Sequence, residues 1–159
     1  MKFTTICATV MSATVCALTS STLAGGGAKA WGWNNDGQTN VPNTANSNVT
    51  AITGGISHTL AIKNSGVLAW GSNDGGLTTV PGAANSGVTK IAAGRYHSLA
   101  LTGTSLVAWG DNSKGQCNIN TANFNISAIA AGYYHSLVLK NGGVFAFGSN
   151  GYSQCTTIF

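Results

Sequence analysis

The sequence repeats a unit of 38 to 39 residues, and this repetition limits the chain to a repeat fold. The histidine of the unit falls at His58, His97 and His135, so successive copies are offset by 39 and then 38 residues. Nine residues after each histidine, an apolar residue opens a segment that ends in Trp-Gly or Phe-Gly. Because this inner spacing is constant, the copies predict one structural unit repeated in space.

Each unit holds short apolar segments bounded by glycine, asparagine and proline, which is the pattern of β-strands separated by turns. The segment led by histidine has apolar residues on both of its faces, as strands do when sheets stack on one another. Four kinds of segment recur, and each is expected to be a strand. They cover residues 28–32, 67–71, 106–110 and 144–148; residues 39–41, 78–80, 118–119 and 156–158; residues 49–52, 88–91 and 126–129; and residues 58–62, 97–101 and 135–139.

Four strands in about 39 residues form the blade of a β-propeller, whereas the coils of a β-solenoid are shorter and lack such hairpins. The predicted fold is therefore all-β, with about three to three and a half four-stranded blades and 14 strands in total. A propeller ring closes with about 4 to 8 blades. The chain is accordingly expected to be a fragment, an open arc, or one part of a ring that a homo-oligomer completes.

The N-terminus has the pattern of a secretory signal peptide. A basic Lys2 precedes an uncharged apolar stretch, and Thr22-Leu23-Ala24 offers small residues suited to cleavage. We expect a signal peptide over 1–24, a flexible lead-in over 25–27 and the repeat domain over 28–159, with a secreted or periplasmic location. A retained membrane anchor is the weaker interpretation, because the apolar stretch is short and contains threonines.

Composition argues against a nucleic-acid partner. Only 6% of the residues are charged, and the basic residues are scattered singly, so no basic run is available to contact phosphates. Outside the predicted signal, two cysteines remain, Cys117 and Cys155, at equivalent positions of neighbouring repeats. Such positions are normally too far apart for a disulfide, so unpaired or intermolecular thiols are favoured over a bridge.

The polar residues that could carry chemistry recur at repeat positions, which favours a structural role. Each of the three histidines is expected to satisfy a turn of its own blade through a hydrogen bond, rather than to join the others in a metal or catalytic site. The acids Asp36, Asp74 and Asp111 lie in Asn/Gly loops and are expected to form turns. We expect no enzyme activity, no catalytic residue, no metal and no cofactor. Two glycosylation patterns occur, at Asn48 and Asn125.

Several segments of the unit carry a family resemblance. Ala69-Trp70-Gly71, Ile91-Ala92-Ala93-Gly94 and His97-Ser98-Leu99-Ala100-Leu101 resemble the repeats of the regulator-of-chromosome-condensation family. The pattern is most similar to short-repeat secreted bacterial members, which inhibit β-lactamases and form seven-bladed propellers. The resemblance implies a propeller and a binding face made of loops at one rim.

The resemblance and the chemistry of the loops together give the expected binding residues, since exposed aromatic side chains and arginine on rigid loops are common binding anchors. The alternative is that these aromatics only pack over the ends of strands. We expect a secreted, non-enzymatic protein-binding module, which would inhibit an extracellular or periplasmic enzyme; the alternatives are a glycan-binding, lectin-like repeat protein and a truncated propeller. The candidate binding residues are Trp33, Asn35, Asp36, Ile56, Asp74, Arg95, Tyr96, Asp111, Lys114, Tyr133, Tyr134 and Tyr152.

Overall fold

The computed structural model describes residues 3–10, 13–20, 26–103, 105–119 and 125–156. Its strands form four antiparallel sheets, each with three strands in sequence order. The first sheet contains β1 (Phe3–Val10), β2 (Ala13–Ser20) and β3 (Ala28–Gly32), and the second contains β4 (Val49–Gly54), β5 (His58–Lys63) and β6 (Gly66–Gly71). The third contains β7 (Val88–Ala93), β8 (His97–Thr102) and β9 (Leu106–Gly110), and the fourth contains β10 (Ile126–Ala131), β11 (His135–Lys140) and β12 (Gly143–Gly148).

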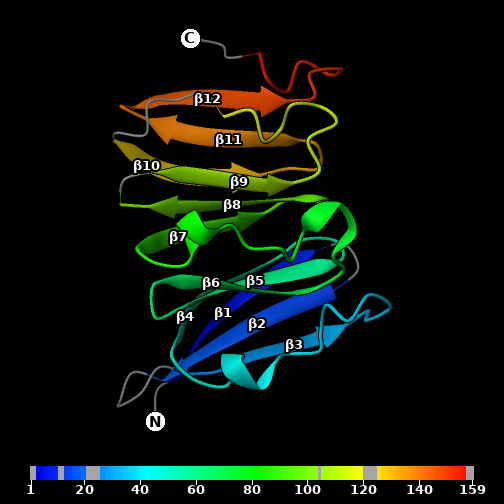
Figure 1. Cartoon of the computed structure of the whole chain (residues 1–159), viewed down its shortest axis with the longest axis vertical. Coiled ribbons are helices and arrows are strands. Elements are labelled where there is room, and N and C mark those ends of the chain that lie inside the picture. Colours follow the sequence, from blue (N-terminus) through cyan, green and yellow to red (C-terminus); the bar gives the residue numbers. More distant parts are fainter. Residues whose placement is uncertain (1–2, 11–12, 21–25, 104, 120–124, 157–159) are drawn as a thin grey trace.

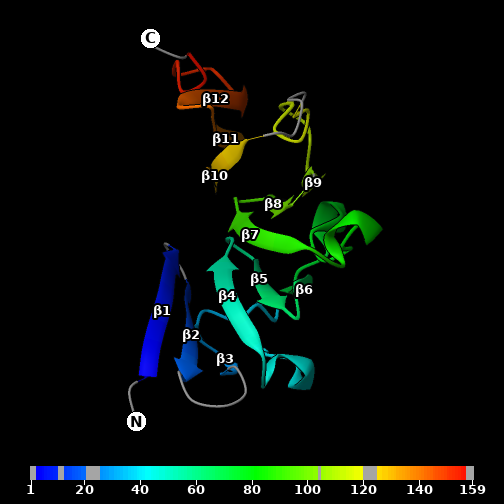
Figure 2. The ribbon, with the colours of Figure 1, turned by 90° about the vertical axis from the view of Figure 1, so that its left-hand side faces the viewer.

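The four sheets follow one another along the long axis of the molecule, from the first sheet at one end to the fourth at the other (Figure 1). The first strands of neighbouring sheets, β1, β4, β7 and β10, contact one another in turn. The view turned by 90° shows β6 and β9 on the opposite side of the stack from β4 and β7 (Figure 2). This arrangement confirms the predicted all-β, propeller-type fold, in which each sheet is one blade.

Apolar side chains fill the spaces between neighbouring sheets. Trp70 of β6 packs with Ala28, Val49 and Ile52 between the first and second sheets. Trp109 of β9 packs with Leu60 and other apolar residues between the second and third sheets. Both tryptophans thus lie in cores between blades, and a large aromatic ring at one repeat position supplies much of each core.

The blades have three strands, not four, because the expected strands over 39–41, 78–80 and 118–119 do not form. In the first of these segments, the amide of Asn40 donates to Gly37 and the amide of Val41 donates to Thr39. Turns within the segment thus use the donors that a strand ladder would need. The expected strand over 156–158 lies largely outside the described residues.

Proline has a different role from the expected one of ending a strand. Pro42 precedes the short 3-10 helix η1 (Asn43–Ala45), and Pro81 precedes the equivalent η3 (Gly82–Ala84). In each case the proline carbonyl accepts a hydrogen bond from the buried alanine three residues later, at 2.8 Å. A third short helix, η2 (Asp74–Gly76), lies in the loop after β6.

The first sheet contains two strands that the sequence did not predict, within the region read as a signal peptide. β2 pairs with β3 so that Thr14 lies opposite Trp31, and β1 pairs with β2. The same pairing joins Thr59 to Trp70 in the second sheet. Residues 3–20 of the uncleaved chain therefore take the backbone course of a blade hairpin. Cleavage after residue 24 stays a prediction.

Candidate functional site

Two kinds of loop meet at one rim of the stack. The turn before β5 and the loop after β6 lie together because His58, the first residue of β5, pairs with Gly71, the last residue of β6. The amide of Ser72 donates to the carbonyl oxygen of Ser57 across these loops, at 2.8 Å. Equivalent bonds join Asp111 to Tyr96 at 2.7 Å and Ser149 to Tyr134 at 2.8 Å. Both groups of loops that were expected to form the binding face thus lie on the same rim.

A cluster of one arginine and three tyrosines forms where the third and fourth sheets meet on this rim. The guanidinium carbon of Arg95 lies 3.9 Å from the centroid of the Tyr133 ring and 4.6 Å from that of Tyr96. The rings of Tyr133 and Tyr134 meet edge to face with centroids 4.6 Å apart, and the rings of Tyr96 and Tyr134 lie 6.3 Å apart. We call these four residues the Arg95 cluster. Stacking on two rings fixes the position of a cation that would otherwise be mobile in water.

A small, mainly apolar cavity of about 180 Å³ opens beside the Arg95 cluster. Glycine allows the turns to approach closely here, because a Cβ atom on Gly94 would lie 2.6 Å from the carbonyl oxygen of Gly132. The size and lining suit a single apolar side chain of a partner. The residues that line the cavity are Ile56, Ala93, Gly94, Arg95, Ala131, Gly132 and Tyr133.

The structure thus brings together five of the expected binding residues, Ile56, Arg95, Tyr96, Tyr133 and Tyr134. It does not place the others in this cluster. Trp33, Asn35 and Asp36 lie exposed in the loop after β3, Asp74 lies exposed in the loop after β6, and Tyr152 lies almost fully exposed in the loop after β12.

Asp111 and Lys114 belong to the loop after β9, whose shape is held by hydrogen bonds within the loop. The carboxylate of Asp111 accepts hydrogen bonds from the amide and hydroxyl of Ser113, both at 3.0 Å, and from Nε2 of Gln116 at 2.9 Å. Burial raises the pKa of this carboxyl, but the bonds from Ser113 and Gln116 outweigh it and hold the pKa below the usual value. These contacts fit the expected turn-forming role of Asp111. Lys114 is exposed, and its amide donates to Gln116 Oε1 at 2.9 Å.

Glutamine at the end of these loops has a role that we did not predict. Gln38 accepts a hydrogen bond from the amide of Asp36 at 3.0 Å, and Gln154 accepts one from the amide of Tyr152 at 2.8 Å. Gln38 and Gln116 are buried, and the hydrogen bonds that they accept from loop amides fix the shape of their rim loops. The sequence did contain an indication of this role, because glutamine recurs six residues after the glycine that ends a Trp-Gly or Phe-Gly segment, at positions 38, 116 and 154.

His58 and His97 are buried, and for these two the expected bond to a turn of the same blade was wrong. Nε2 of His58 lies 2.9 Å from Oγ of Ser98, and Nε2 of His97 lies 2.9 Å from Oγ of Ser136, in each case in the next sheet. The imidazole does pack against the turn of its own blade, but without a hydrogen bond. A Cβ atom on Gly94 of that turn would lie only 2.5 Å from Nδ1 of His97. The histidine therefore joins two blades.

Burial keeps these two imidazoles neutral. It lowers the pKa of His58 from 6.5 to about 4, with a smaller contribution from the charge of His97. Burial likewise lowers the pKa of His97 to about 4, helped by the charge of His135 and opposed by the carboxylate of Asp111. Within the described part of the chain, no three His, Cys, Asp or Glu residues are grouped so that they could hold a metal ion.

Both cysteines outside the predicted signal are free thiols. Burial, and then the charge of Asp111, raise the pKa of Cys117 to about 11, and burial also raises the pKa of Cys155. Cys117 donates to the carbonyl oxygen of Asp111 at 3.4 Å, and Cys155 donates to that of Ser149 at 3.1 Å. Each thiol thus supports its own rim loop, and a protonated thiol is a poor nucleophile.

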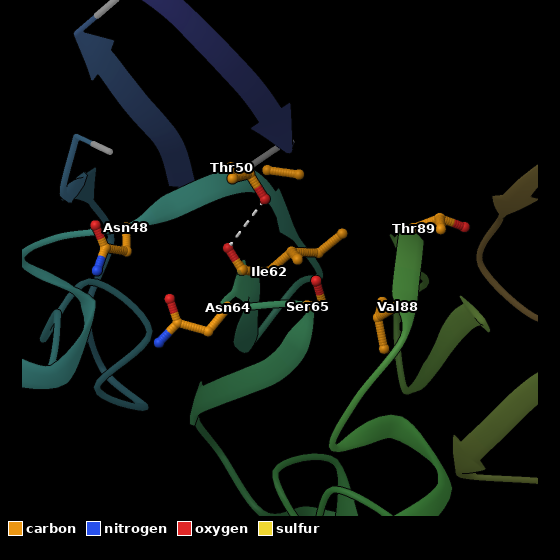
Figure 3. A pocket seen from close by; sticks show the side chains of 8 residues that line it. Asn48, Thr50, Ile62, Asn64, Ser65, Val88 and Thr89 are labelled. Carbon is orange, nitrogen blue, oxygen red and sulfur yellow. Dashed lines mark hydrogen bonds between the residues drawn. The ribbon is translucent and has the colours of Figure 1, made fainter. Parts of the chain in front are cut away.

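A second hollow, of about 450 Å³, lies at the other ends of the strands, between the second and third sheets (Figure 3). Its lining mixes polar side chains, among them Asn48, Asn64 and Thr89, with the apolar Ala51, Ile62 and Val88. The hydroxyl of Thr50 donates to the carbonyl oxygen of Ile62 at 3.5 Å (Figure 3). Asn48 and Asn64 have φ angles of 58° and 49°, in the left-handed region that asparagine tolerates better than most residues other than glycine. Both residues are exposed, so these turns present amide side chains to the solvent.

Comparison with known proteins identifies the repeat. The model of the family described as "Regulator of chromosome condensation (RCC1) repeat" matches residues 88–116 and 126–154. These two ranges begin at the first strands of the third and fourth sheets, β7 and β10, and end in their rim loops. No curated protein matches the chain by sequence. Among the described residues, no helix is long and apolar enough to cross a membrane.

Solved structures show the same fold at low sequence identity. A chain in the crystal structure of Kap60 bound to yeast RCC1 (Prp20) matches with a TM-score of 0.70 and 19% identity, over 94% of this chain and 45% of that one. Prp20p from Saccharomyces cerevisiae matches with a TM-score of 0.69 and 18% identity, over 93% of this chain and 46% of that one.

A plant receptor also matches. The ectodomain of the Physcomitrella patens receptor kinase CR4 gives a TM-score of 0.67 and 22% identity, over 89% of this chain and 40% of that one. The chain thus spans less than half the length of these three structures. Residues 88–116 and 126–154 thus match regulator of chromosome condensation (RCC1) repeats, and the chain shares the blade architecture of these propellers.

Proposed function

We propose that the chain is a secreted or periplasmic, non-enzymatic module that binds a partner protein through the rim around the Arg95 cluster. Blades of this kind are typical of protein interaction domains, and their rim loops are held on a rigid stack. The proposal includes inhibition of an extracellular enzyme as the consequence of binding. It agrees with the expectation from sequence, in which rim residues bind a protein.

One observation carries this proposal: Arg95 is fixed between two tyrosine rings at the mouth of an apolar cavity. Nε of Arg95 is buried and has no hydrogen-bond partner among the described residues. A guanidinium stacked on aromatic rings keeps its edge free for a carboxylate or carbonyl oxygen. The preferred partner surface therefore presents an apolar side chain next to an acidic group.

Two structural neighbours give general support for a protein partner. In one of them yeast RCC1 is bound to Kap60, and the other is a structure of Prp20p, which has binding properties toward Gsp1p and histones. Those partners are properties of the yeast protein. For this chain they support a class of function, protein binding by a propeller, and the Arg95 cluster supplies the chemistry of its own surface.

A lectin-like function is the second candidate, and the amide and hydroxyl groups in the hollow of Figure 3 favour it. Asn48, Asn64 and Thr89 offer amide and hydroxyl groups in a space of about 450 Å³. Sugars are bound by such uncharged groups. However, described aromatic rings line only the rim cavity and not this hollow, so the stacking that sugar sites commonly use is lacking there.

The two functions can be separated with two probes. The chain is panned against a phage-displayed library of random peptides and, in parallel, applied to a glycan array. Peptides with an apolar residue beside an acid should be enriched, and Arg95→Ala and Tyr133→Ala should each weaken their binding at least tenfold. Lys90→Ala is the matched control, because it removes one exposed positive charge from β7 of the third sheet. Enrichment that survives Arg95→Ala would refute the rim proposal, and glycan signals in its place would support the lectin.

A further inference from the structure

One pattern of contacts joins the first sheet to the second and the second to the third, whereas Phe147 takes the tryptophan position in the fourth sheet. The indole N–H of Trp70 donates to the carbonyl oxygen of Gln38 in the rim loop of the preceding sheet, at 3.0 Å. The indole N–H of Trp109 donates to the equivalent carbonyl oxygen of Leu77, at 2.9 Å. The loop carbonyl of one sheet therefore receives the tryptophan of the following sheet.

The first sheet has a tryptophan at the same position, Trp31, and none of the described residues offers it a loop carbonyl. Ala28 and Ala30 of β3 pack toward the second sheet, so Trp31, between Ala30 and Gly32, projects from the opposite face. Its side chain is 50% exposed, whereas those of Trp70 and Trp109 are buried. Lys29 shares this outer face, at the position that the half-buried Leu68 takes in β6. We call this surface the head face.

The fourth sheet lacks a neighbour on its other side, among the described residues, and leaves apolar side chains exposed there. In the second sheet, Leu60, Ile62 and Val67 are buried against the tryptophan of the third sheet. The equivalent residues Leu137, Leu139 and Val144 form the outer face of the fourth sheet, where Val144 is 47% exposed. We call this surface the tail face, and none of the described residues covers it.

The polar partners on the tail face are also incomplete. Gln154 takes the place of Gln38 and Gln116 at the end of its rim loop, yet it is partly exposed while they are buried. His135 takes the place of His58 and His97, and no described serine faces it from a following sheet. On the head side, Thr14 of β2 stands opposite Trp31, at the register position that Ser98 and Ser136 occupy in later sheets.

We propose that, in the chain that keeps residues 3–20, the head face of one copy docks on the tail face of a second copy, which continues the stack of blades through the same contacts. The indole N–H of Trp31 then donates to the carbonyl oxygen of Gln154 in the other copy, and Leu137 and Val144 are covered. Two copies joined at both ends would supply four sheets each. Since one chain spans 40% to 46% of the propeller chains compared above, two copies approach the length of one of them.

The proposal is tested by the mass of the full 159-residue chain, measured by light scattering after size exclusion. The wild-type chain should be a dimer. Trp31→Asp on the head face and Val144→Asp on the tail face should each give a monomer with an unchanged circular dichroism spectrum. Tyr152→Asp is the control, because this exposed side chain lies on the rim and the dimer should survive its substitution.

A mixture of the two monomeric variants distinguishes the possible geometries. Head-to-tail docking predicts a dimer in the mixture, because the intact head of the Val144→Asp chain meets the intact tail of the Trp31→Asp chain. If Trp31→Asp alone stays dimeric while Val144→Asp is monomeric, the interface is tail to tail and the proposal is wrong. A monomeric wild-type chain also overturns it.

A cross-link covers the case in which an aspartate variant does not fold. Trp31→Cys and Gln154→Cys are combined with Cys7→Ser, Cys16→Ser, Cys117→Ser and Cys155→Ser, so that the two introduced thiols are the only ones in the chain. Head-to-tail docking predicts a disulfide-linked dimer under mild oxidation, which requires both introduced cysteines. Equal cross-linking by a variant that has only one of them would contradict the proposed pairing.

Discussion

Nε2 of His97 lies 2.9 Å from the hydroxyl oxygen of Ser136, which belongs to the next sheet. The same hydroxyl donates to the carbonyl oxygen of Gln116 at 2.8 Å, so it must accept its second bond from His97. This chain of bonds requires the tautomer of His97 that carries its proton on Nε2. One serine thus connects a histidine and a rim loop, both of the third sheet, to the fourth sheet.

We predict that Ser136→Ala lowers the free energy of unfolding by about 1–3 kcal/mol, because it leaves a buried imidazole donor and a buried carbonyl without partners. Denaturant unfolding followed by circular dichroism measures the change. Ser127→Ala is the matched control, since the Ser127 hydroxyl is exposed and makes a longer bond of 3.3 Å. Equal effects of the two substitutions would show that the buried contact adds nothing.

Acid should destabilise the fold through the two buried histidines. The folded-state pKa of His58 and His97 is about 4, below the ordinary 6.5, so the unfolded chain binds protons first as the pH falls. Their contribution is fully present above pH 6.5 and is lost as the pH falls toward 4, by roughly 2–3 kcal/mol for each histidine. Unfolding in denaturant at a series of pH values measures this slope.

His97→Gln provides the control for the pH experiment. Glutamine can still donate to Ser136 but does not titrate, so the slope between pH 6.5 and pH 4 should become shallower. A slope that His97→Gln leaves unchanged would place the acid sensitivity elsewhere, for example in the carboxyl of Asp111, whose lowered pKa acts in the same direction at lower pH.

The tryptophans should differ in their effect on stability according to the face that they occupy. Trp109→Ala removes a buried ring from the core between the second and third sheets and the bond to Leu77, so we expect a loss of about 3–5 kcal/mol. Trp33→Ala, at an exposed rim position, should change stability by less than about 0.5 kcal/mol. Thermal and denaturant unfolding measure both. A large loss for Trp33→Ala would indicate that the loop aromatics belong to the core.

The sequence predicted the blades well because their strongest signals are local. Apolar residues at a period of two, turn glycines and the Trp-Gly ending identified the three strands of each repeat after the first. The segment at residues 39–41 has the same local pattern, but its amides bond within a turn and the carbonyl of Gln38 bonds to Trp70, so no ladder forms. A pattern of residue types does not show which partner a backbone group takes.

Contacts between blades were harder to predict than contacts within one. His97 was assigned to its own turn, yet its partner Ser136 lies 39 residues away in the next copy of the unit. The Arg95 cluster could be foreseen in part, since Arg95, Tyr96, Tyr133 and Tyr134 fall at equivalent turns. The stacking of the third and fourth sheets decides which rim residues gather around Arg95. The sequence of a single repeat does not predict how two sheets stack.

Glycine at the rim turns should be essential, because the histidine of the same blade fills the space beside it. A Cβ atom on Gly94 would lie 2.3 Å from Cε1 of His97 and 2.6 Å from the carbonyl oxygen of Gly132. The carbonyl belongs to a backbone turn that cannot move aside cheaply, so Gly94→Ala should cost about 1–3 kcal/mol or more. It should also reduce binding at the neighbouring Arg95 cluster.

Gly82→Ala is the control for this last substitution, since no atom lies within 4 Å of the added methyl group and its φ angle is not in the positive range. It should leave stability unchanged or raise it by up to about 1 kcal/mol, because alanine restricts the unfolded chain. Unfolding midpoints of the two variants, measured side by side, test the difference. If Gly94→Ala is as stable as Gly82→Ala, the turn can relax, and the close packing of His97 against Gly94 does not hold the two sheets together.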